Sequence, residues 1–406
     1  ALPICWRTMS ASEALQNDST AWYITFTPAN QYYQLRNAAT GQYMTYSGGF
    51  KTMTRTTLAN SDNFHLMKGR VDVGSGQGVQ RGYWLIHPTG NLTPNCIAAN
   101  TNGAIASQTF DLKNTATKQR WLILTADDIL TFENGVVAQL KAEVNSILTP
   151  IKALAEVPHT CSPADADQTF TDAIGSIEQT LNTATAPSEL VSLTDEAWKA
   201  AQTFLNAATP TDAEQPFDLT FLIKNAGMDA ADGWSEAPTI NYSCGEFYEK
   251  TFTLRQNLTQ MPIGTYRLQM QGFQRPGTTA DSYSDWAAGS NKVNALLYLG
   301  TKSVKIAHIA DYAQSVRLST DDKQVGGKYY VPNTMLGASK YFAKGHYENT
   351  LYATTTSALW YFGLRSSSMP TSYWCIFDNF RLQFFGSMTE GQVTTVDAVS
   401  VSNEGN

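Results

Sequence analysis

The stretch Gly264-Thr-Tyr-Arg-Leu-Gln-Met-Gln-Gly-Phe273 decides the fold of the longest segment of the chain. Its side chains alternate, with Tyr266, Leu268 and Met270 on one face. Polar side chains of Arg, Gln and Gln occupy the positions between them. Successive side chains of a β-strand point to opposite faces, so this period of two predicts a strand with one apolar and one polar face.

Further apolar runs on both sides of this stretch predict more strands. They are Phe217-Asp-Leu-Thr-Phe-Leu-Ile223, Ala295-Leu-Leu-Tyr-Leu299, Ser357-Ala-Leu-Trp-Tyr-Phe-Gly-Leu-Arg365 and Trp374-Cys-Ile-Phe-Asp-Asn-Phe-Arg-Leu-Gln-Phe384. Long loops separate these runs and no long helical pattern intervenes. Residues 210–388 are therefore expected to form a two-sheet sandwich, followed by a flexible tail over residues 389–406.

Residues 129–209 show a helical period instead. Apolar residues recur at steps of three and four in three stripes. The stripes are Val137, Leu140, Val144, Ile147, Ile151 and Leu154; Phe170, Ile174, Ile177 and Leu181; and Leu190, Leu193, Ala197, Ala201, Phe204 and Ala208. For the second helix we expect Ser162 as N-cap, Pro163 at N1 and Asp165 at N3. Pro187 is expected at the start of the third. Short connections predict an up-down-up three-helix bundle that serves as a spacer.

Residues 1–128 read as short strands and turns. The strand candidates are Trp22–Phe26, Tyr33–Asn37, residues 38–46 around a Thr40-Gly41 turn, Phe64–Met67, Tyr83–His87 and Cys96–Ala99. Tyr33-Gln-Leu-Arg-Asn-Ala-Ala-Thr-Gly-Gln-Tyr-Met44 resembles one unit of a ricin-type β-trefoil. Gln119-Arg120-Trp121 resembles the Q-x-W signature of that family, in which the Trp is buried. The resemblance implies a trefoil fold without requiring a sugar site.

The sandwich segment resembles the galactose-binding-like jelly roll found in secreted proteins of the Bacteroides type. The matching phrases occur in the family's order over about 170 residues. They are Asp218-Leu-Thr-Phe-Leu-Ile-Lys-Asn-Ala-Gly227 with Gly233-Trp234, Glu246-Phe-Tyr248 with Phe252, Pro262–Arg275, Val331-Pro-Asn333, Tyr347-Glu-Asn349 and Phe377-Asp-Asn-Phe-Arg-Leu382. The resemblance implies a jelly roll of carbohydrate-binding-module type.

The composition excludes several classes of protein. The net charge is −7 and the basic residues form no cluster, which disfavours nucleic-acid binding. No apolar run reaches the roughly 18 residues of a membrane helix. The low charged fraction of 16% and the aromatic fraction of 11% are typical of an extracellular β-rich protein. We therefore expect a secreted or surface-exposed protein whose signal peptide is absent from this chain.

The five cysteines and five histidines are isolated in the sequence. The spacing contains neither a CxxC pair nor HExxH, so no metal and no cofactor are predicted. An odd number of cysteines leaves at least one thiol unpaired. Single buried thiols are the favoured interpretation over a disulfide framework.

A sugar site needs aromatic faces that stack on pyranose rings and planar polar groups that bind hydroxyls. The segment after the Gly-Phe-x-Arg strand, Arg275-Pro-Gly-Thr-Thr-Ala-Asp-Ser-Tyr-Ser-Asp-Trp286, combines both as a polar loop. The candidate glycan-binding residues are Arg275, Tyr283, Asp285 and Trp286, with Tyr312 and Arg365 expected at the same rim. For Arg275 and Arg365 a purely structural role is the favoured interpretation, and for Trp286 the two are balanced.

These residues favour a non-catalytic protein that binds polysaccharide or host glycan. One alternative is a glycoside hydrolase or esterase with acids in the sandwich loops, since a glycosidase needs two carboxylates about 5–9 Å apart. The other alternative is a surface adhesion protein that binds a second protein through a flat apolar patch.

Overall fold

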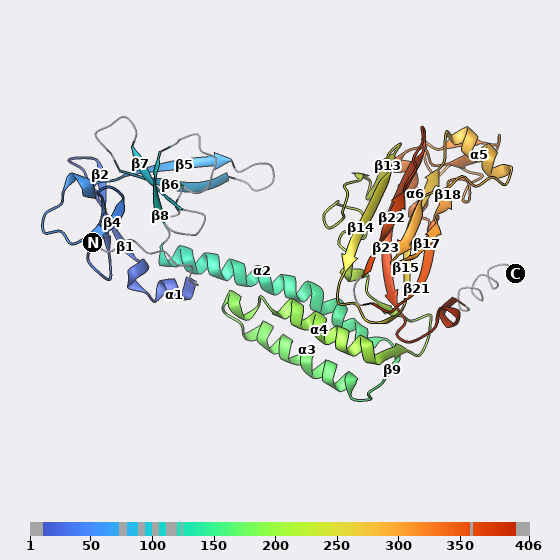
Figure 1. Ribbon diagram of the computed structural model, residues 1–406, viewed down its shortest axis with the longest axis horizontal. Coiled ribbons are helices and arrows are strands. Elements are labelled where there is room, and N and C mark those ends of the chain that lie inside the picture. Colours follow the sequence, from blue (N-terminus) through green and yellow to red (C-terminus); the bar gives the residue numbers. More distant parts are fainter. Residues whose placement is uncertain are drawn as a thin grey trace. The chain divides into compact units, whose positions relative to one another are not determined.

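The computed structural model describes residues 11–72, 79–87, 94–99, 105–110, 119, 121, 123, 125–357 and 360–394 (Figure 1). The chain divides into two compact units, one of Ala1–Leu140 with Thr185–Ser188 and one of Lys141–Ala184 with Glu189–Asn406. Both units contain antiparallel sheets. In the sequence, a helical segment separates the sheets of the first unit from the large sheets of the second, and most of this segment belongs to the second unit. A multi-domain, mainly β organisation with a helical insert is thus confirmed at this coarse level. The four-segment division of the sequence stays a prediction.

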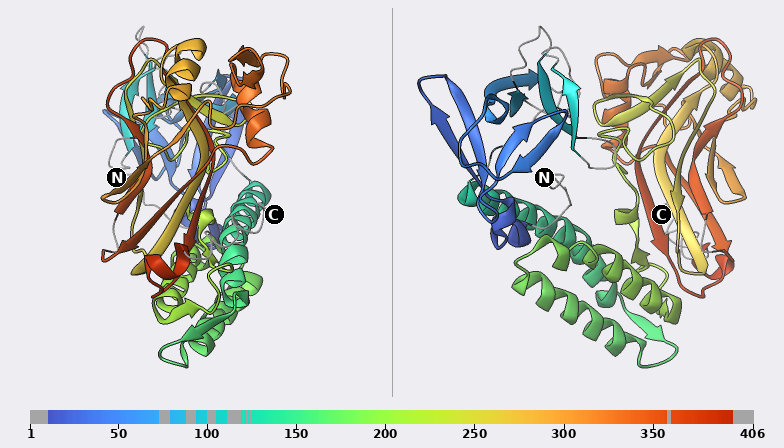
Figure 2. Two further views of the ribbon diagram at one scale, coloured as in Figure 1. Left: turned by 90° about the vertical axis from the view of Figure 1, so that its right-hand side faces the viewer. Right: turned by 60° about the vertical axis from the view of Figure 1, so that its left-hand side comes forward.

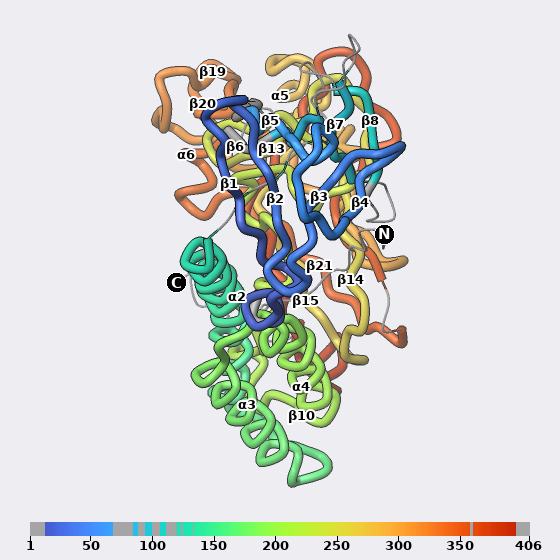
Figure 3. Tube along the Cα trace, turned by 90° about the vertical axis from the view of Figure 1, so that its left-hand side faces the viewer, coloured from blue at the N-terminus to red at the C-terminus, as the bar shows by residue number. Residues whose placement is uncertain are grey.

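The first unit contains two four-stranded antiparallel sheets whose strands follow chain order. One sheet consists of β1 (Trp22–Thr27), β2 (Tyr32–Asn37), β3 (Tyr43–Tyr46) and β4 (Phe50–Met53), which run side by side in Figure 3. The other consists of β5 (His65–Asp72), β6 (Val79–His87), β7 (Asn95–Ala99) and β8 (Ile105–Thr109). A bridge between Tyr33 and Phe64 connects the two sheets. Each predicted strand of this segment overlaps an observed one.

The core of this unit lies around buried Leu35, Phe64 and Leu85. Trp121 packs against this cluster, and its indole N–H donates to the Ile97 carbonyl over 3.0 Å. Gln119 is buried and donates to the Thr109 carbonyl over 3.0 Å. The two described residues of the Gln-Arg-Trp triplet therefore have structural contacts, as expected for a Trp in the core.

The three predicted helices are present as α2 (Ala126–Ala153), α3 (Ala166–Thr183) and α4 (Leu193–Ala207). Their apolar stripes are buried, and the Phe170 and Phe204 rings of α3 and α4 stack at 4.6 Å.

The expected starts of two helices were wrong. α3 begins after Asp165, because β9 (His159–Cys161) pairs with β10 (Ala208–Pro210) and the Ser162 amide donates to the Ala207 carbonyl. Pro187 opens a short 3₁₀ turn, and α4 begins after Ser192.

The second unit also contains a seven-stranded and a four-stranded sheet. Their strand pairs are antiparallel except for one parallel pair, β15 (Gly264–Arg275) with β18 (Ala307–His308). The seven-stranded sheet has the order β12-β13-β23-β15-β18, with β11 beside β23 and β21 beside β15. Its strands are β11 (Phe217–Asp218), β12 (Thr239–Asn241), β13 (Cys244–Tyr248), β15 (Gly264–Arg275), β18 (Ala307–His308), β21 (Glu348–Thr355) and β23 (Trp374–Phe384). The four-stranded sheet has the order β14 (Phe252–Leu258), β22 (Trp360–Ser366), β16 (Leu296–Leu299) and β17 (Lys302–Lys305).

The two sheets face each other across an aromatic core (Figure 1). Tyr266 of β15 contacts Trp360 of β22 at 4.9 Å between ring centroids. Phe247 of β13 stacks on Phe252 of β14 at 4.2 Å. The predicted alternation on β15 is confirmed, since Tyr266, Leu268 and Met270 are fully buried in this layer. The central and closing strands thus occupy the positions that their patterns indicate.

The first predicted strand of this segment is mostly not a strand. Only Phe217–Asp218 pairs with β23, and Thr220–Leu222 form a 3₁₀ turn. The Asp218 carboxylate accepts the Thr220 amide over 2.8 Å, which turns the chain away from the sheet. At the other end, residues 390–394 of the predicted tail are helical and Val393 is buried. Residues 395–406 of that tail lie outside the described residues.

Within the described part of the chain, no helix is both long and apolar enough to cross a membrane. Cys96, Cys161, Cys244 and Cys375 are free thiols, in agreement with the prediction of unpaired cysteines. Cys5 lies outside the described residues.

Candidate functional site

The segment predicted as a polar loop forms a helix. Thr279–Ala287 are α5, at the end of the sheets opposite to α3 and α4 (Figures 1 and 2). Thr278 is the N-cap residue, because its hydroxyl accepts the Asp281 amide and donates to the Asp281 carboxylate. This reciprocal cap stabilises a short helix that the Gly- and Ser-rich composition does not predict.

α5 brings three of the predicted site residues together. The Tyr283 and Trp286 rings lie 5.8 Å apart, and Asp285 forms a 2.7 Å ion pair with Lys292. Trp286 is 37% exposed, and its indole N–H donates to Asp311 over 2.8 Å. The other oxygen of Asp311 accepts the His308 amide over 2.7 Å. Asp311 therefore anchors the exposed face of Trp286 to the loop that follows β18.

A groove of about 660 Å³ opens beside Asp311. It lies between the edges of the two sheets, because its walls include Lys305 of β17 and Glu348 of β21. Tyr312 forms part of the wall, and its ring stacks on His346 at 5.1 Å. The lining combines one ring, one cation and two carboxylates with amide side chains. Such a mixture can bind hydroxyl groups while one ring face contacts an apolar surface.

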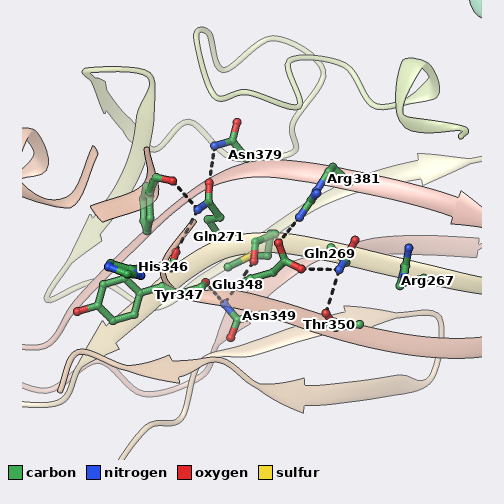
Figure 4. A network of polar contacts seen from close by, with 12 residues as sticks. Arg267, Gln269, Gln271, His346, Tyr347, Glu348, Asn349, Thr350, Asn379 and Arg381 are labelled. Atoms are coloured by element: carbon green, nitrogen blue, oxygen red, sulfur yellow. Dashed lines mark hydrogen bonds and ion pairs between the residues drawn. The ribbon is translucent and has the colours of Figure 1, made fainter. Parts of the chain in front are cut away.

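Polar side chains on the outer face of the seven-stranded sheet hold Glu348 in place (Figure 4). Gln269 donates to one oxygen of Glu348 over 2.6 Å and to the Thr350 hydroxyl over 3.2 Å. Arg381 forms an ion pair with the other oxygen. Both oxygens of Glu348 thus have fixed partners, which makes the carboxylate a rigid part of the groove wall.

A β-bulge extends this network. Gln269 pairs with Arg381 and Gln271 with Asp378, so β23 has one residue more than β15 between these pairs. Asn379 lies in the bulge with φ +53° and donates to Gln271 over 2.7 Å. A second groove of about 400 Å³ is lined by Gln271, Glu348, Asn379 and Arg381, among others. Glu348 therefore separates two grooves.

His308 directly follows Ala307 of the groove wall and is fully buried. Its Nδ1 accepts the Ala310 amide over 3.1 Å, and Nε2 has no hydrogen-bond partner among the described residues. Burial lowers the pKa of His308 below its usual value, against the opposing effect of Asp311 and Asp285. The ring is therefore neutral at pH 7 and packs beneath Asp311.

Two predicted residues lie elsewhere. Arg275 ends β15, where its guanidinium donates to the Ser372 carbonyl over 3.1 Å and lies 5.4 Å from the Trp374 ring. These contacts favour the structural interpretation. Arg365 was expected at the rim with Tyr312, but it lies on β22 of the four-stranded sheet, 4.9 Å over the Tyr298 ring. It is two strands away from Lys305, which does line the groove.

Sequence reasoning missed the two groove carboxylates, Asp311 and Glu348. Glu348 lies in the Tyr347-Glu-Asn349 phrase that supports the family resemblance. That phrase drew attention to the residue but predicted no function for it. Asp311 directly precedes Tyr312, and its bond to Trp286 joins residues 25 positions apart. Only the fold reveals that contact.

Among the described residues, no group of three or more His, Cys, Asp and Glu side chains is placed to hold a metal ion. No family model matches the chain, and no curated protein matches it. The groove is therefore the feature that indicates a function.

Proposed function

We propose that this chain is a non-catalytic carbohydrate-binding protein, secreted or surface-exposed, that captures a polysaccharide or host glycan. In this proposal the first sheets belong to a β-trefoil-like domain, the helices to a three-helix spacer and the last two sheets to a jelly roll. The observation that carries the proposal is the groove beside Asp311. Tyr312 lines this groove, and the Trp286 indole N–H donates a hydrogen bond to Asp311 in its wall.

The chemistry of the groove supports a sugar rather than an apolar ligand. Asp311, Glu348 and Lys305 present charged and hydrogen-bonding groups around an open volume. Both carboxylates are oriented by fixed donors, which lowers the entropy cost of binding hydroxyl groups. Tyr312 and Trp286 supply ring surface for the apolar face of a sugar.

A glycan-array screen of the intact chain, repeated with Tyr312→Ala and Trp286→Ala, tests this proposal. We expect binding to a defined glycan class that falls at least tenfold in both variants, since each removes a stacking surface. Tyr242→Ala is the matched control, because that tyrosine is 60% exposed and is not among the groove-lining residues. Absence of binding to any glycan by the folded protein would contradict the proposal.

One observation favours the hydrolase alternative, namely that Asp311 and Glu348 line the same groove. A glycosidase uses such a pair as acid and nucleophile or base. Their fixed partners favour a binding role, because Trp286, the His308 amide, Gln269 and Arg381 already engage the four oxygens. Release of reducing sugar from a glycan bound in the array, lost in Asp311→Asn and Glu348→Gln, would support the hydrolase instead.

A further inference from the structure

The outer face of the four-stranded sheet carries positive charge in a protein whose net charge is −7. Inward residues such as Leu254, Leu297 and Leu364 are fully buried, so the alternate residues point outward. The outward set is Thr253, Arg255 and Asn257 of β14; Tyr361, Gly363 and Arg365 of β22; Leu296 and Tyr298 of β16; and Ser303 and Lys305 of β17. It contains three cations and no carboxylate.

Both arginines of this face stack on tyrosines. The Arg365 guanidinium lies 4.9 Å from the Tyr298 ring centroid, and that of Arg255 lies 5.7 Å from Tyr361. Tyr298 is opposite Gly363, and its hydroxyl donates to the Leu254 carbonyl over 3.4 Å, so the ring crosses the glycine. The ring contact leaves the guanidinium N–H donors able to bind an anionic group in a planar fork.

No ion pair joins Arg255, Arg365 or Lys305 to a carboxylate of the described residues. The charge of Glu236 acts on the Tyr298 hydroxyl, as do the opposite charges of Arg255 and Arg365. Its carboxylate accepts the Thr253 amide over 2.9 Å at the β14 edge of the sheet. The surface therefore presents cations whose charge the fold leaves largely uncompensated.

The basic face is continuous with the groove. Lys305, Leu296 and Arg365 form one cross-strand row, and Lys305 also lines the groove. Neighbouring strands lie about 4.8 Å apart, so Arg365 is roughly 10 Å from Lys305 along this row. Arg255 occupies the next row, opposite Gly363. A chain-like ligand that leaves the groove over Lys305 would reach both arginines.

We propose that the ligand is an acidic polysaccharide, whose uronate or sulfate groups bind Arg365 and Arg255 while a neighbouring sugar occupies the groove. This inference rests on the proposed function and names its ligand class. Carboxylate and sulfate share the required chemistry, since both present two or more oxygens to a guanidinium edge. Charge complementarity also predicts binding that weakens as salt rises.

The test measures binding of the full chain to two matched pairs of polymers. Polygalacturonate is compared with its methyl ester, and dextran sulfate with dextran, so that the two members of each pair share a sugar backbone and one of them lacks the anionic groups. The double variant Arg255→Gln/Arg365→Gln and the single variant Lys305→Gln remove the cations. Arg317→Gln is the control, because that exposed arginine also stacks on a tyrosine, 5.0 Å over Tyr330, away from this sheet. Melting temperatures identify any variant that fails to fold. If the double variant fails to fold, the affinity of the Lys305→Gln variant for the charged polymers tests the inference.

We expect at least one charged polymer to bind tenfold or more tightly than its neutral partner. The double variant should lose about tenfold or more of that affinity, and the control should lose none. The polymer pair whose affinities differ shows whether the protein binds the carboxylate or the sulfate. Equal binding of charged and neutral polymers, or binding insensitive to the cations, would overturn the inference and leave the proposed function standing. Binding to neither these polymers nor the array would refute the proposed function, and the inference with it.

Discussion

Asp378 shows how burial of a single residue changes its chemistry. Its side chain is only 7% exposed, and one oxygen accepts the Asn379 amide over 2.6 Å. Burial raises the pKa of Asp378 to about 7, and the nearby charge of Asp229 adds to this effect. A folded-state pKa above the unfolded value near 3.8 means that the folded state binds the proton more tightly. This contribution to stability is full below about pH 4 and is lost as pH rises through 7.

Asp378→Asn is therefore expected to have an effect that depends on pH. At pH 8 the wild-type carboxylate is charged and poorly solvated, so the neutral amide should stabilise the fold by about 1–3 kcal/mol relative to wild type. At pH 5 the wild-type group is already protonated, and the gain should shrink. Chemical denaturation of both proteins at the two pH values gives the difference. The opposite result would be a difference in unfolding free energy, variant minus wild type, that is smaller at pH 8 than at pH 5. It would show that the charged form of Asp378 has a stabilising partner.

At the scale of the element, a tight hairpin supports α5. β19 (Lys323–Val325) and β20 (Tyr329–Val331) pair across Gly326 and Gly327, which have φ values of +54° and +73°. A Cβ on Gly326 would lie 2.5 Å from the Tyr283 ring, whereas one on Gly327 would meet nothing within 4 Å. Tyr283 in turn lies beside Trp286. The hairpin thus determines where the exposed ring of α5 lies.

Gly326→Ala and Gly327→Ala form a matched pair for this element. Both should cost about 1–2 kcal/mol, because an L-residue is strained at positive φ. Only Gly326→Ala should also displace Tyr283, lower the melting temperature further and reduce glycan affinity. Calorimetry and a binding titration on both variants test this expectation. Equal effects of the two substitutions would mean that the hairpin does not position Tyr283.

At the scale of the whole molecule, the chain forms two compact units. The groove and the basic face both belong to the second unit. A ligand that binds only the folded form of one unit stabilises that unit, by about 2.7 kcal/mol at one hundred times its Kd.

Differential scanning calorimetry should therefore resolve two unfolding transitions. A bound glycan should raise the transition of the second unit and leave the other unchanged. The Asp378→Asn variant assigns the transitions, because its substitution also lies in the second unit. A single transition that moves as a whole with ligand would show that the two units unfold together.

The elements with strong periodicity could be predicted from the amino-acid sequence. The alternation along Gly264–Phe273 and the stripes of the three helices depend on which side chains must be buried, and periodicity records that directly. Of the aromatic residues predicted for the site, Tyr312 lines the groove, while Tyr283 and Trp286 pack together on α5 and Trp286 bonds to Asp311 of the groove wall.

Only the tertiary structure decided the rest, because it depends on contacts between distant residues. The start of α3 differs from the prediction because β9 pairs with β10, which follows α4. Thr160 of β9 pairs with Thr209 of β10, 49 residues later in the sequence. Asp311 and Glu348 line the same groove because the groove lies between the edges of the two sheets. Arg365 lies on the basic face because the cross-strand register places it in one row with Lys305. No local sequence pattern encodes that register.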